Sequence, residues 1–128
     1  MSDKMLPGQE LLRGERVVSH NGKYSLVMQD DGNLVLYDGN GTALWNSGTQ
    51  NIAIQKCVMQ PDGNLILYRY DGVAAWSSGT NGKPGANLII QNDGNVVIYY
   101  EPKPEAIWAT RTNQQTSTTV MPSPVVTE

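Results

Sequence analysis

The sequence predicts an all-β domain that is built from three copies of one small sheet. The stretch QDDGNLVLY at residues 29–37 recurs as QPDGNLILY at 60–68 and as QNDGNVVIY at 91–99, each copy 31 residues after the last. Short runs of Val, Ile, Leu and Tyr alternate with Gly, Pro, Asn and Asp, which is typical of strands joined by tight turns. Repetition at this spacing indicates equivalent units that are too small to fold alone and must share a core.

Each copy is predicted to form a hairpin, because an Asp-Gly pair flanked by alternating apolar residues is a strong hairpin signal. We place the turn on Gly32, which puts Gln29 opposite Val35 and Val27 opposite Tyr37. Alternation along the strands then directs one set of apolar side chains into the core and the other set outward. The inward set is Leu26, Met28, Leu34 and Leu36 in the first copy, Cys57, Met59, Leu65 and Leu67 in the second, and Leu88, Ile90, Val96 and Ile98 in the third.

A second turn follows each hairpin and leads to a strand that ends at a tryptophan. Trp45 and Trp76 are 31 residues apart, and Trp108 follows after 32, with the extra residue in the loop EPKPE at 101–105. Each unit is therefore predicted to be an antiparallel sheet of three or four strands. Because shared burial explains a large residue at matched positions, we expect the three rings to pack near a common axis.

The repeats assign residues 1–112 to a single domain. Residues 113–128 are rich in Thr, Ser and Pro. We predict that they form either a flexible tail or a segment that is exchanged with a partner subunit in a homodimer.

Charge and hydropathy exclude several partners. The net charge of the 128 residues is -3 and the nine Lys and Arg are scattered, whereas a nucleic-acid surface requires a concentrated basic face. No run of 18 apolar residues is present, so we expect no membrane insertion. The N-terminal residues lack the apolar segment of a signal peptide, which predicts a cytoplasmic protein or one secreted without a cleavable signal.

Catalysis, metal binding and cofactors are not expected. The chain has one histidine, His20, in a turn-like stretch, and one cysteine, Cys57, at a core position, so it lacks a base with an orienting partner. The repeated carboxylates occur one per copy, which gives no glycosidase-like pair. The stretch DDGN resembles a calcium loop, but the twelfth position counted from Asp30 is Gly41 and not Glu.

The outward face of the repeated motif carries an amide, a carboxylate, a second amide and a phenol around one apolar side chain. In a straight strand the first and last of these would stand about 26 Å apart at about 3.3 Å per residue, whereas the hairpin brings them together. Such a set suits a neutral, polyhydroxylated ligand. Turn chemistry explains Asp-Gly-Asn but not an outward Gln and Tyr in every copy.

The pattern Gln-x-Asp-x-Asn-x-Val-x-Tyr, present three times with a Trp after each copy, resembles the monocot mannose-binding lectins, the snowdrop-lectin family of bulb-type B-lectin domains. The resemblance covers roughly residues 6–112. It implies a β-prism II fold, in which three antiparallel four-stranded sheets surround a pseudo-threefold axis and each sheet carries one site.

In this family the Asp and Asn bind the axial O2 of mannose, the Gln reaches O3, the Tyr hydroxyl reaches O4 and the Val packs against the ring. The resemblance therefore implies three carbohydrate sites for mannose and mannose-rich glycans. The first site is Gln29, Asp31, Asn33, Val35 and Tyr37; the second is Gln60, Asp62, Asn64, Ile66 and Tyr68; the third is Gln91, Asp93, Asn95, Val97 and Tyr99.

The chain departs from the plant pattern at a few positions. Plant members usually carry a disulfide with one Cys in the first turn, where this chain has Gly32, and Cys57 has no partner. Ile66 replaces Val in the second site, and the loop after Tyr100 neighbours the third. An alternative function is a lectin-like toxin, bacteriocin or protein-interaction module with reduced sugar binding.

Overall fold

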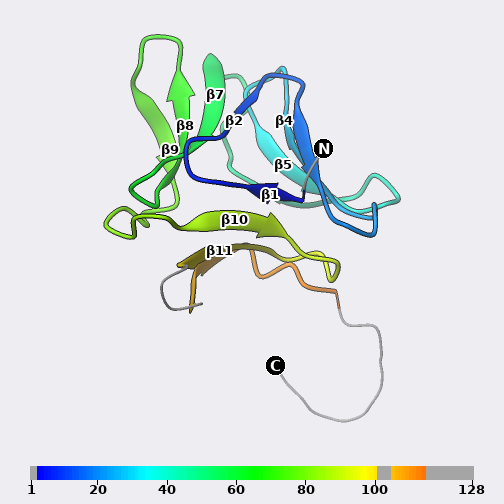
Figure 1. The fold of residues 1–128 in the computed structure, drawn as a ribbon. Helices are drawn as coiled ribbons and strands as arrows, with labels where there is room; N and C mark the ends of the chain where they lie inside the picture. Colours follow the sequence, from blue (N-terminus) through cyan, green and yellow to red (C-terminus); the bar gives the residue numbers. More distant parts are fainter. Residues whose placement is uncertain (1–2, 101–104, 115–128) are drawn as a thin grey trace.

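The computed structural model describes residues 3–100 and 105–114, and every regular element in these ranges is a β-strand. The strands form three antiparallel sheets of four, arranged like the sides of a triangle around a common centre (Figure 1). The expected β-prism II architecture is thus confirmed. The predicted tail and the loop EPKPE, apart from Glu105, Asn113 and Gln114, lie outside the described residues.

Each repeat supplies three strands of one sheet. The first sheet has the order β3 (Arg16–Val18), β4 (Ser25–Met28), β5 (Leu34–Tyr37) and β6 (Ala43–Asn46). The second has β2 (Glu10–Leu12), β7 (Ile54–Met59), β8 (Leu65–Arg69) and β9 (Ala74–Ser77). The third has β1 (Lys4–Met5), β10 (Asn87–Ile90), β11 (Val96–Tyr100) and β12 (Glu105–Ala109).

The N-terminal segment contributes one short strand to every sheet. β1, β2 and β3 follow each other in the chain but pair with β10, β7 and β4 respectively. Each strand inserts one buried apolar side chain into the core, namely Met5, Leu11 and Val17. This segment therefore connects the three sheets, a role that the repeat pattern did not predict.

All inward residues that alternation predicts are buried. The twelve positions lie in one core cluster, each exposing no more than 1% of its surface. Cys57 occupies the same place in the second sheet as Leu26 and Leu88 in the others, since it pairs with Leu67 as they pair with Leu36 and Ile98. The face that each residue presents was thus predicted correctly.

The predicted hairpin register was wrong by two residues. Val27, and not Gln29, lies opposite Val35, and Ser25, and not Val27, lies opposite Tyr37. The cause is the turn geometry: the Gly32 amide donates to the Gln29 carbonyl at 3.1 Å, so Gly32 closes the turn and does not form its centre. A slip of two residues leaves every side chain on its original face, which is why the core prediction was unaffected.

The three tryptophans pack against one another as expected. Their ring centroids are 5.6 to 5.8 Å apart, with interplanar angles between 71° and 81°, so each ring meets the other two edge to face. All three are partly buried against the core cluster. One tryptophan from each sheet therefore joins the repeats in a single structure.

Candidate functional site

The turn of the repeated motif draws the two ends of the candidate site together. In the first copy the backbone amide of Gln29 donates to the backbone carbonyl of Asn33 at 2.9 Å. Gly32 has a φ of 94°, a conformation that L side chains rarely adopt, and a Cβ here would collide with the carbonyl oxygen of Ile52. The second and third copies repeat these turn bonds around Gly63 and Gly94.

One oxygen of each site aspartate is committed to the turn. Asp31 Oδ1 accepts from the Asn33 backbone amide at 2.9 Å, and Asp62 and Asp93 make the same bond at 3.0 and 2.9 Å. Within residues 3–100 and 105–114 the second carboxylate oxygen makes no hydrogen bond. Because these aspartates are exposed, that oxygen can accept a hydrogen bond from a ligand hydroxyl.

The side-chain oxygen of each site asparagine is held by the loop that follows the Trp strand. Asn33 Oδ1 accepts from the Thr49 amide at 3.1 Å and from Ser47 Oγ at 3.2 Å. Asn64 makes the equivalent pair of bonds, and Asn95 accepts from three donors. These donors identify the oxygen of the amide, so its Nδ2 group is left to donate outward.

The site glutamine and tyrosine are joined by a hydrogen bond in all three copies. Gln29 Nε2 donates to the Tyr37 hydroxyl, Gln60 Nε2 donates to that of Tyr68, and Gln91 donates to that of Tyr99 at 2.8 Å. Each phenol therefore accepts from the protein and retains its own proton for a ligand. The Gln Oε1 atom makes no hydrogen bond in the described part of the chain and can accept.

The apolar member of each site lies deeper than the polar ones. Val35, Ile66 and Val97 expose only 3%, 8% and 2% of their surface, although they stand on the outward face of the sheet. They therefore form the floor between the asparagine and the tyrosine. In each copy the turn bond brings the Asp next to the Asn and a side-chain bond joins the Gln to the Tyr, and the convergence of all five residues on one ligand stays a prediction.

The arrangement is chemically uniform across the copies. Each site offers two free acceptors, from Asp and Gln, and two free donors, from Asn and Tyr, above a small apolar floor. Among the residues that the structure describes, no three His, Cys, Asp or Glu side chains come together. Alternating neutral donors and acceptors, with one carboxylate, are suited to a ligand that carries several neighbouring hydroxyl groups.

The residues that position the asparagines were not predicted from the sequence. Ser47-Gly48-Thr49 recurs as Ser78-Gly79-Thr80 after 31 residues and as Thr110-Arg111-Thr112 after a further 32. In each triplet the last hydroxyl donates to the carbonyl of the turn glycine and contacts the first hydroxyl at 2.7 Å. The same repeat spacing that revealed the motif could have revealed these triplets.

Cys57 takes no part in these sites. It is fully buried, and burial raises the pKa of its thiol to about 12. A thiol with so high a pKa is not a nucleophile near neutral pH.

In the part of the chain that the structure describes, no helix is long and apolar enough to span a membrane.

Comparison with solved structures identifies similar proteins over nearly the whole fold. A monomeric monocot mannose-binding lectin from Gastrodia elata is 43% identical, with a TM-score of 0.78 over 88% of this chain and 99% of that one. The snowdrop (Galanthus nivalis) mannose-specific agglutinin, solved with methyl-α-D-mannoside, is 35% identical, with a TM-score of 0.69 over 89% and 100% of the two chains.

A bacterial lectin is also similar. The domain-swapped lectin dimer from Mycobacterium smegmatis is 39% identical, with a TM-score of 0.53 over 84% of this chain and 98% of that one. No protein-family profile and no curated protein matches the chain. The solved neighbours are therefore lectins from both plants and bacteria.

Proposed function

Because the chain belongs to the family of the monocot mannose-binding lectins, we propose that it binds mannose and mannose-containing glycans at three sites, one on each sheet. The neighbours are lectins, which bind sugars without transforming them, so we infer a binding protein and not an enzyme. The observation that carries the proposal is the set of free donors and acceptors that recurs in every copy.

In the proposed complex the free atoms of a site each meet one hydroxyl of the sugar. The carboxylate of Asp31 accepts from O2 and the amide of Asn33 donates to it, while Gln29 binds O3 and the Tyr37 hydroxyl donates to O4. The ring carbons rest on the apolar floor. The second and third sites use the equivalent residues.

Selectivity for mannose follows from the two groups that share O2. Glucose carries this hydroxyl in the equatorial position, where the carboxylate and the amide would be left poorly paired. An unpaired polar group costs about 1–3 kcal/mol, which corresponds to a complex weaker by roughly fivefold to 150-fold. We therefore expect mannose to be bound in preference to glucose.

Binding at one site is expected to be weak. About four hydrogen bonds, each worth roughly 0.5–1.5 kcal/mol net, must offset the cost of association. Useful affinity then requires a branched glycan or a polysaccharide that engages several sites together. Three sites on one chain supply this multivalency.

A mannan column tests the proposal. We expect the protein to be retained and to be released by free mannose but not by the same concentration of glucose. The triple variant Asp31→Asn, Asp62→Asn, Asp93→Asn should pass through, because each Asn keeps the oxygen that caps the turn but replaces the free acceptor with a donor. Circular dichroism and the unfolding midpoint check that the variant is folded.

Passage of the wild-type protein straight through the column would contradict the proposal. That result would favour the alternative of a toxin-like or protein-interaction module that uses the same fold with reduced sugar binding.

We propose no fixed oligomeric state from the described residues. The Gastrodia lectins are described as monomeric and the mycobacterial lectin as a domain-swapped dimer, so family members differ in this respect. Exchange of a C-terminal strand remains a prediction for this chain. Light scattering with and without residues 113–128 tests whether this segment is exchanged. The same number of chains per particle in both samples would rule out its exchange.

A further inference from the structure

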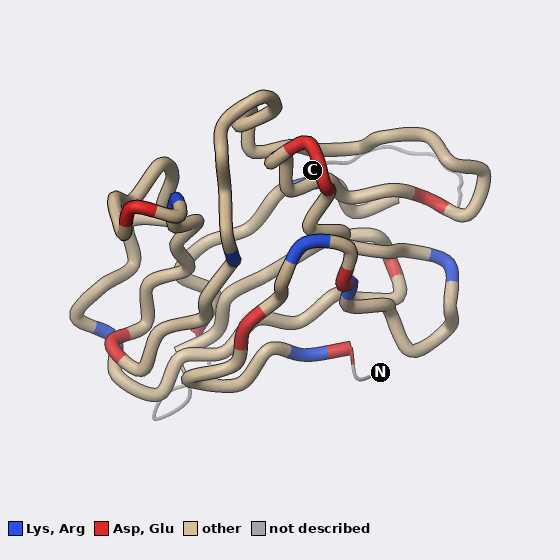
Figure 2. The backbone as a smooth tube through the Cα atoms, turned by 90° about the horizontal axis from the view of Figure 1, so that it is seen from above, with Lys and Arg blue, Asp and Glu red and all other residues tan. Residues whose placement is uncertain are grey.

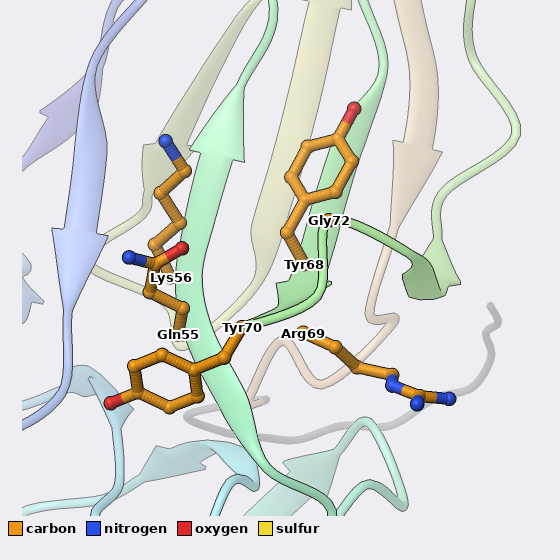
Figure 3. Close-up of a pocket in the computed structure, with 6 residues that line it drawn as sticks. All are labelled: Gln55, Lys56, Tyr68, Arg69, Tyr70 and Gly72. Atoms are coloured by element: carbon orange, nitrogen blue, oxygen red, sulfur yellow. The ribbon is translucent and has the colours of Figure 1, made fainter.

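The second repeat differs from the others beside its proposed sugar site. A shallow depression of about 280 Å³ lies next to Tyr68, the tyrosine of that site (Figure 3). Small-molecule pockets in proteins measure about 300–1,000 Å³, so this volume suits one small group. Its lining residues are Gln55, Lys56, Tyr68, Arg69, Tyr70 and Gly72.

A β-bulge shapes one wall of the depression. Ile54 pairs with Arg69 and Lys56 pairs with Tyr68, so Gln55 is an extra residue in β7. The corresponding pairs β4–β5 and β10–β11 run without a register shift in the first and third sheets. Since a bulge redirects side chains locally, it gives Gln55 a different setting from the equivalent residues of the other repeats, Tyr24 and Ala86.

A lysine stands beside the site tyrosine in this sheet alone. Lys56 lies directly opposite Tyr68, where the first sheet has Ser25 opposite Tyr37 and the third has Asn87 opposite Tyr99. Figure 3 shows the Lys56 and Tyr68 side chains extending in the same direction from neighbouring strands. An ammonium group therefore stands at the edge of the second site, where the paired positions of the other two sheets carry a serine and an asparagine.

The hairpin between β8 and β9 adds an exposed aromatic ring. It carries Arg69 and Tyr70 where the first repeat has Asp38 and Gly39. The Tyr70 side chain is 58% exposed, and its hydroxyl accepts a hydrogen bond of 3.4 Å from Arg13. An exposed, tethered ring of this kind can stack against the C–H groups of a sugar.

The two cations that line the depression are both paired. Lys56 binds Glu10 at 3.1 Å and Arg69 binds Asp71 at 2.6 Å, whereas Arg13, which donates to the Tyr70 hydroxyl, has no ion pair among the described residues. Figure 2 shows the Lys and Arg positions spread over several parts of the backbone and interspersed with Asp and Glu positions. The depression thus offers hydrogen-bond donors and an aromatic ring, and both of its lining cations are already neutralised by a carboxylate.

We propose that this depression is a subsite for a second, neutral sugar residue that is linked to the mannose in the second site. Tyr68 belongs to both the site and the depression, so a linked residue would lie within reach of both. The Tyr70 ring stacks against it, and the Gln55 amide and the Lys56 ammonium bind its hydroxyls. This inference rests on the proposed function and makes the second site selective for oligosaccharides.

Calorimetry on a chain with one working site tests the subsite. The background variant Asp31→Asn, Asp93→Asn leaves only the second site, which removes multivalency. We expect at least one of α1,2-, α1,3- and α1,6-linked mannobiose to bind about tenfold more tightly than methyl-α-D-mannoside, as expected for one added stacking contact. Adding Tyr70→Gly, the residue of the first repeat, should abolish this difference and leave the affinity for the mannoside unchanged.

Two further variants separate the contributions. Tyr70→Phe keeps the ring and should keep most of the preference for the disaccharide. Lys56→Ser, which copies the first sheet, should reduce the preference without abolishing it. Thermal unfolding verifies that each variant is folded.

The outcomes distinguish this inference from the proposed function. Equal affinities for the mannoside and every mannobiose, or a preference that survives Tyr70→Gly, would overturn the subsite while the sugar site stands. Tighter binding of mannose 6-phosphate that weakens with salt would overturn the assignment to a neutral residue. Absence of mannoside binding would overturn the proposed function and the subsite with it.

Discussion

The asparagine of each proposed site holds the fold with one side-chain atom and leaves another atom for the proposed ligand. In the second site Asn64 is 8% exposed, and its Oδ1 accepts from Ser78 Oγ and from the Thr80 amide, both at 3.2 Å. Its Nδ2 group is free to donate to a sugar. A substitution therefore affects stability, binding or both, according to which atom it removes.

Two substitutions of Asn64 should separate these roles. Asn64→Ala leaves the Ser78 and Thr80 donors without an acceptor, so the free energy of unfolding should fall by about 1–3 kcal/mol. Asn64→Asp keeps the accepting oxygen and removes the donor, so it should weaken mannoside binding with a smaller loss of stability. Urea unfolding measures the effect on stability and calorimetry measures the effect on binding. An unchanged urea midpoint for Asn64→Ala would show that the Oδ1 hydrogen bonds do not stabilise the fold.

At the scale of elements, the hairpin turn determines how the site is assembled. Alternation predicted every inward residue correctly because it depends only on strand periodicity. It could not predict the register, since the Val27–Val35 pairing and the expected Gln29–Val35 pairing direct the same residues inward. What distinguishes them is the turn bond from the Gly32 amide to Gln29, a detail that the letters Asp-Gly do not specify.

Two glycines of the first repeat test the role of the turn. Gly32 and Gly41 both have a positive φ, of 94° and 83°, but only a Cβ at Gly32 would meet backbone atoms. Gly41→Ala should therefore lose only the roughly 1–2 kcal/mol that left-handed backbone costs an L residue. Gly32→Ala must also displace the Ile52 carbonyl and should be clearly less stable, with weaker binding at the first site. Equal unfolding midpoints of the two variants would contradict this account.

The short N-terminal strands show another limit of prediction from sequence. β1, β2 and β3 contain two or three residues each, too few for a recognisable alternation. Their partners lie far along the chain, as in the pairing of Lys4 with Ile89. Such long-range pairings depend on the assembled core and not on local sequence.

At the scale of the whole molecule, three similar sheets enclose one core and present three similar sites. The Trp contacts and the N-terminal strands hold the sheets in fixed positions, so the sites face outward from three sides of the prism. The repeat spacing in the sequence was sufficient to predict this symmetry, whereas the assignment of five residues to each sugar site stays a prediction. The replacement of Val by Ile66 was visible in the sequence, whereas the bulge at Gln55 was visible only in three dimensions.

The number of mannose sites per chain is the most direct test of the account. Calorimetric titration with methyl-α-D-mannoside should give weak binding at three sites per chain in the wild-type protein. Asp31→Asn should reduce the number to two, and adding Asp62→Asn and Asp93→Asn should reduce it to none while the fold is kept. Binding that persists in the folded triple variant, or no binding by the wild-type protein, would contradict the assignment of the three sites.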